Sequence, residues 1–92
     1  MKRIELRDEL TLTRTPALLE SLATQLEAPV TLLDLAAVSE IDSSAVSLLL
    51  ACQRRAQANG IELRCSNLPA GLRSLTQLYS VSSLIPDASG DN

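Results

Sequence analysis

The feature that most constrains the fold is a short apolar run near the middle of the chain, Val30-Thr31-Leu32-Leu33-Asp34-Leu35. Pro29 precedes it and Ala36-Ala37 follow it. Short apolar runs with such boundaries are typical of a strand that is buried on both faces and lies in the middle of a sheet. The run therefore predicts a sheet covered by helices.

The segments before this run predict extended chain followed by a helix. Lys2 to Leu6 and Leu10 to Thr13 alternate apolar and polar residues across the charged triplet Arg7-Asp8-Glu9, which indicates a hairpin or two short strands. Thr15-Pro16 offers a cap followed by proline at the first helical position. A leucine face then recurs at helical spacing until Ala28-Pro29 ends it, and it consists of Leu18, Leu19, Leu22 and Leu26.

A second helix is predicted from Ala45 to Asn59, because Asp42-Ser43-Ser44 supplies N-cap chemistry and Gly60 supplies the end. Its main apolar stripe contains Ala45, Leu48, Leu49, Cys52 and Ala56. Val46 and Leu50 fall away from the centre of that stripe and add apolar surface. This additional apolar surface fits either a partner interface or a helix that is buried on both sides.

The remaining elements are one strand and one further helix. Ile61-Glu62-Leu63-Arg64-Cys65 alternates as a half-exposed strand does. Leu68-Pro69 opens a helix with the stripe Leu72, Leu75 and Leu78, and Val81, Leu84 and Ile85 close the core before Pro86. The last six residues, Asp87 to Asn92, form a polar tail that we expect to be disordered.

The resulting order is strand, strand, helix, strand, helix, strand, helix. It predicts an α/β domain with a mixed sheet of about four strands, covered by about three to four helices. A chain of 92 residues fits a single domain, here residues 1–86. Because Tyr79 is the one aromatic residue, the core must be assembled from aliphatic side chains.

Charge and hydropathy exclude several classes of partner. The net charge is −3 and the eight basic residues are scattered, which argues against nucleic acid because phosphate binding requires clustered cations. The longest apolar stretches are far shorter than the roughly 20 residues of a membrane span, and the first residues do not form a signal peptide. We therefore expect a cytoplasmic protein without direct membrane insertion.

The sequence also lacks the residue combinations that enzymes use for catalysis. The chain contains no histidine, no glycine-rich phosphate loop and no carboxylate pair at a recognisable spacing. Cys52 and Cys65 have no CxxC spacing, and two buried, reduced thiols are the expected state. We predict no catalytic residue, no cofactor and no metal site.

The stretch from Leu33 to Ala45, with Asp34-Leu35 at the end of a buried strand and Asp42-Ser43-Ser44 opening a helix, resembles the STAS family. This family comprises sulfate-transporter and anti-sigma-factor-antagonist domains. The resemblance extends to the element order and so covers nearly the whole chain. It implies a STAS-like fold and a structural, loop-capping role for Asp34. The chain departs from the family pattern at Ala45, where glycine is usual; alanine inside the first helical turn should be harmless.

The segments Gly60-Ile61-Glu62-Leu63, Leu75 to Val81 and Leu84-Ile85-Pro86 resemble the STAS subunit of Mla-type ABC transporters. This resemblance implies a non-catalytic accessory subunit that binds the transporter ATPase in phospholipid traffic between membranes, with a peripheral place at the inner membrane. The alternative that the family implies is an anti-sigma-factor antagonist, whose partner is a serine kinase.

The predicted partner-binding or phosphoswitch residues surround the helix that begins after Asp42. They are Asp42, Ser43, Ser44, Val46, Leu50 and Tyr79. Ser43 matches the family position that a kinase phosphorylates. The alternative is that Ser43, or Asp42, is only an N-cap. Tyr79 is either a partner anchor or an edge of the core.

Overall fold

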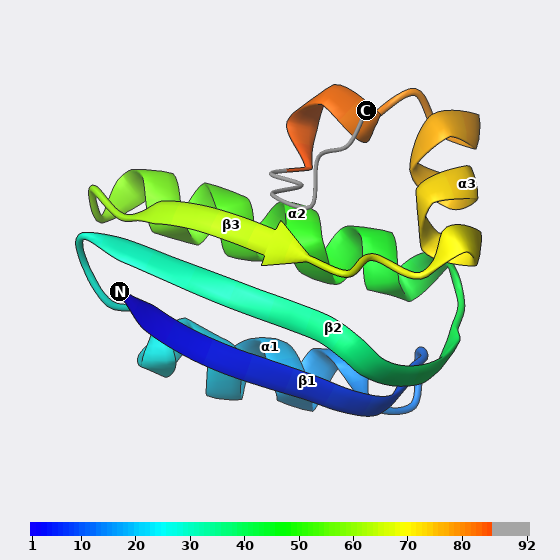
Figure 1. The fold of residues 1–92 in the computed structure, drawn as a ribbon, viewed down its shortest axis with the longest axis horizontal. Helices are drawn as coiled ribbons and strands as arrows, with labels where there is room; N and C mark the ends of the chain where they lie inside the picture. The colour runs from blue at the N-terminus through cyan, green and yellow to red at the C-terminus, as the bar shows by residue number, and fades with distance from the viewer. Residues whose placement is uncertain (86–92) are drawn as a thin grey trace.

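The structure is a computed structural model that describes residues 1–85. The predicted tail and the domain boundary at Pro86 lie outside these residues. The elements in chain order are β1 (Lys2–Leu10), α1 (Thr15–Gln25), β2 (Val30–Ile41), α2 (Ser43–Ala58), β3 (Glu62–Ser66), α3 (Ala70–Leu78) and the short 3-10 helix η1 (Ser82–Leu84), as Figure 1 shows.

The described strands form one sheet in the order β1-β2-β3, and this confirms the α/β architecture and the central place of β2. Both neighbouring pairs are parallel, whereas a mixed sheet was predicted. Within residues 1–85 the sheet has three strands, slightly fewer than predicted, because the expected N-terminal hairpin is the single strand β1. The charged triplet does not turn the chain; Asp8 takes a positive φ of 65° and the register with β2 shifts there.

Within residues 1–85, one face of the sheet packs on helices and the other does not. Figure 1 shows α1 and α2 together behind the sheet. The side chains buried against them alternate along the strands and include Leu6, Leu10, Leu33, Leu35, Leu63 and Cys65. The intervening residues Arg3, Glu5, Glu62 and Arg64 are exposed. The prediction that Val30 to Leu35 is buried on both faces is confirmed for the face that the helices cover. On the other face Val30 and Leu32 are only half-buried, and Asp34 is buried.

The helices contribute the rest of the core. All five residues of the stripe predicted for α2 are buried, and so is Val46. Leu22 of α1 and Leu72 of α3 are also fully buried, each adding about 1.5 to 3 kcal/mol of burial free energy. Leu78 was predicted on the stripe of α3, but it is the last residue of this helix and is exposed.

Asp34 is buried on the uncovered face of the sheet by polar neighbours. Its carboxylate accepts hydrogen bonds from the backbone N–H of Ala36 at 3.0 Å and from Nδ2 of Asn67 at 2.9 Å, and it pairs with the Arg3 guanidinium. These bonds, that from Asn67 first, lower the pKa of Asp34 to about 2. Asp34 thus joins β1, β2 and the turn after β3, which is a structural role.

Neither cysteine is available for chemistry at the surface. Cys52 and Cys65 are fully buried and free of disulfides. Burial raises the pKa of the Cys52 thiol to about 11, so the reactive thiolate is disfavoured. In the part of the chain that the structure describes, no group of three or more metal-ligating side chains comes together, and no helix is long and apolar enough to cross a membrane.

Candidate functional site

Asp42 is the N-cap of α2 and joins this helix to the end of β1. Its extended backbone precedes the first helical residue, and its carboxylate accepts hydrogen bonds from the backbone N–H and hydroxyl of Ser44. The same carboxylate accepts the backbone N–H of Leu12 at 2.9 Å. These bonds, that from the Ser44 hydroxyl first, lower the pKa of Asp42. Asp42 is therefore ionised at neutral pH and fixes the β1–α1 turn against α2.

Ser43 is the first residue of α2, and its side chain is exposed. Within residues 1–85 its hydroxyl takes part in no hydrogen bond. Of the two caps considered from the sequence, Asp42 is the one that forms. The Ser43 hydroxyl is consequently free to meet a partner or to be modified, at a helix N-terminus where negative charge is electrostatically favoured.

Leu12 adds an apolar element that the sequence reasoning missed. It is 70% exposed and is held beside α2 by the bond from its N–H to Asp42. The alternation of Leu10 to Thr13 had placed it in a strand; the exposed leucine could have been found only by recognising that Thr11 begins a turn. We name the surface formed by Leu12, Asp42, Ser43, Ser44 and Ser47 the α2 N-terminal patch.

A groove leads from this patch along the seam between α1 and α2. Its volume is about 390 Å³. Pro16 and Leu19 line it from α1, Leu48 and Ala51 line it from α2, and Arg54 lies at its far end. The patch is therefore continuous with an apolar depression, which is the kind of surface that a partner protein can fill.

The other predicted site residues lie elsewhere. Val46 is 4% exposed and belongs to the core. The prediction that it lies on a docking surface is therefore wrong, and for this residue the alternative of a helix buried on both sides holds. Leu50 is half-buried and faces η1. Tyr79 is the C-cap of α3 and is 51% exposed. Ala45 is buried inside the first turn of α2, the position where alanine in place of glycine is harmless.

The two neighbouring residues Asp42 and Ser43 should respond differently to alanine. Asp42→Ala removes the three hydrogen bonds that the carboxylate accepts from Leu12 and Ser44. The melting temperature should therefore fall by several degrees. Ser43→Ala should leave it near the wild-type value, because this hydroxyl caps nothing. Thermal unfolding followed by circular dichroism measures both. Equal destabilisation by the two variants would show that Ser43 shares the capping.

Comparison with known proteins gives matches at the level of family and fold. The family described as "Mlab, STAS domain" matches residues 2–86. The solved structure of the anti-sigma factor antagonist SpoIIAA in its unphosphorylated form is similar, with a TM-score of 0.73 and 21% identity over 94% of this chain and 77% of that one. A sulfate transporter family protein from Wolinella succinogenes gives a TM-score of 0.70 and 17% identity, covering 98% and 71%. A search of curated proteins gave no significant match.

Proposed function

Because the chain belongs to the STAS domain family, we propose that it is a non-catalytic interaction module that binds and stabilises the ATPase of an Mla-type ABC transporter. In this role it is a cytoplasmic accessory subunit, held at the inner membrane through the transporter, and it serves phospholipid transport between membranes. The description of the matching family, "Mlab, STAS domain", supports this choice among the functions of STAS domains.

The observation that carries the proposal is the state of Ser43. It is exposed on the first turn of α2, and Asp42 performs the capping that would otherwise occupy its hydroxyl. Exposed Leu12 lies on the same patch, and the groove between α1 and α2 continues it. A small uncharged hydroxyl beside an exposed leucine suits close packing by a partner, with the leucine as an apolar anchor.

A second candidate function is supported by the same serine. An anti-sigma-factor antagonist would use phosphorylation of Ser43 to release a serine kinase partner, and the similarity of fold to SpoIIAA supports this alternative. A phosphate on Ser43 would add about −1.5 to −2 charge beside the ionised Asp42. The helix N-terminus favours the phosphate, so the domain would stay folded. The added charge would prevent the partner from docking on the patch.

Purification of the tagged protein from the native lysate, followed by mass spectrometry, separates these functions. We expect an ABC-transporter ATPase and its permease to co-purify in stoichiometric amounts. A serine kinase in place of the ATPase would contradict the transporter role and support the antagonist.

A further inference from the structure

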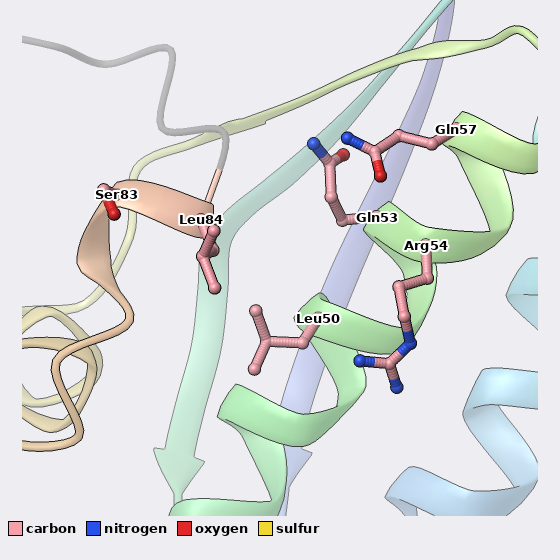
Figure 2. Close-up of a pocket in the computed structure, with 6 residues that line it drawn as sticks. All are labelled: Leu50, Gln53, Arg54, Gln57, Ser83 and Leu84. Carbon is pink, nitrogen blue, oxygen red and sulfur yellow. The ribbon is translucent and has the colours of Figure 1, made fainter.

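A second groove lies between the C-terminal half of α2 and η1, well along the helix from Ser43. Its volume is about 310 Å³. Leu50, Gln53, Arg54 and Gln57 line it from α2, and Ser83 and Leu84 line it from η1, as Figure 2 shows. Leu84 is 55% exposed, so the groove has an apolar wall that no side chain of residues 1–85 covers.

The amide of Gln53 is the first polar feature of this groove. Its Oε1 atom is buried, and no donor among the described residues bonds to it. An acceptor that has lost water without gaining a partner is costly, so most such atoms in folded proteins are paired. Gln57 follows four residues later on α2 and therefore adjoins Gln53 on the helix surface. The two amides form a short polar row beside the apolar wall.

Arg54 is the second polar feature, and it gives the groove a sign of charge. It is exposed, and no acidic side chain of residues 1–85 pairs with it. Among residues 1–85, no carboxylate lines the groove. A cation beside an apolar wall favours one particular kind of occupant, an apolar group next to a carboxylate.

We propose that this groove binds an extended segment of the partner protein that carries an apolar side chain next to an acidic one. The apolar side chain packs between Leu50 and Leu84, and the carboxylate pairs with Arg54. The Gln53 amide turns on binding, so that Oε1, which is buried in the free protein, accepts a backbone N–H of the segment. The segment is extended because the N–H groups inside a helix are already bonded to its own carbonyls. This inference rests on the proposed function, since it gives the partner a second contact beyond the α2 N-terminal patch.

Titration of the ¹⁵N-labelled full chain with two blocked peptides tests the proposal without the partner protein. The probes are acetyl-Ser-Leu-Asp-Ser-amide and its neutral counterpart acetyl-Ser-Leu-Asn-Ser-amide. We expect both to shift the side-chain amide signals of Gln53 and Gln57, with the acidic peptide binding about threefold to fivefold more tightly. Arg54→Gln should abolish this preference, whereas the control Arg55→Gln should keep it, because Arg55 is also exposed but lines another cavity.

Three results would overturn the proposal. The first is the absence of shifts at Gln53 and Gln57, and the second is an undiminished preference for the acidic peptide in Arg54→Gln. The third is tighter binding at the same signals by acetyl-Pro-Asp-Ala-Ser-Gly-Asp-Asn, the sequence of residues 86–92, which would make this chain's own C-terminus the occupant. Because no partner is present in the titration, its failure is a separate result from failure to co-purify an ATPase.

Discussion

Replacing Asp34 by alanine is expected to lower the free energy of unfolding by about 2 to 3 kcal/mol. Asp34 is 2% exposed, and its carboxylate accepts bonds from Ala36, Asn67 and Arg3. Alanine leaves the Ala36 N–H and the Asn67 amide without their acceptor and unties β1 and the β3–α3 turn from the central strand. Urea denaturation measures the change.

Substitutions at Asn67 separate the hydrogen bond from the backbone conformation. Asn67 has a positive φ of 57°, which asparagine and glycine tolerate better than alanine. Asn67→Gly should therefore lose only the bond to Asp34, about 1 kcal/mol, and Asn67→Ala should lose more. A neutral effect of Asp34→Ala would contradict the structural role of this carboxylate.

The pH dependence of stability provides a further check on Asp34. Its pKa is depressed in the folded protein to about 2, so the folded state favours the ionised form. The stabilisation is then fully present above about pH 4 and is lost as the pH falls toward 2, amounting to about 2 kcal/mol. Asp34→Asn should flatten this part of the stability profile, and an unchanged profile would contradict the assignment.

Ser43→Glu is expected to abolish co-purification of the partner while the melting temperature stays near the wild-type value. The new carboxylate lies at the N-terminus of α2, where the helix dipole offsets its repulsion by Asp42, so the fold should tolerate it. Inside a docked interface the same charge would lack a cationic partner, at a cost of several kcal/mol or at least about 100-fold in affinity. Co-purification and thermal unfolding are measured on the same preparation.

Ser21→Glu is the matched control, because Ser21 is also an exposed helical serine but lies on α1 away from the patch. It should retain the partner. A folded Ser43→Glu protein that still binds would show that Ser43 is outside the interface, and loss of binding by both variants would show that added negative charge anywhere weakens the complex.

The sequence predicted best those features that follow from local patterns. The stripe of α2 is buried as its 3.6-residue period requires, and Gly60 follows the end of the helix with the positive φ that glycine tolerates. The N-cap chemistry before α2 was also correctly located, although the sequence alone did not decide between Asp42 and Ser43.

The features that were missed depend on which surfaces meet. An apolar run such as Val30 to Leu35 has the same composition whether helices cover one face of the sheet or both, and here polar bonds to Asp34 replace a helix on the second face. The exposure of Leu12 arises from a turn. The two grooves that Arg54 lines arise where α1 and η1 lie beside α2. The periodicity of apolar residues within one segment does not indicate which other segments that segment will contact.

Photo-crosslinking from two surface positions tests the central claim, that the transporter ATPase docks on the α2 N-terminal patch. A benzophenone side chain would replace Ser47, which is exposed one turn after Ser43, or Arg64, which is exposed on the uncovered face of the sheet. Illumination in native lysate followed by mass spectrometry should give an ATPase adduct from position 47 and none from position 64. An adduct from position 64 alone would place the interface on the sheet and contradict the account.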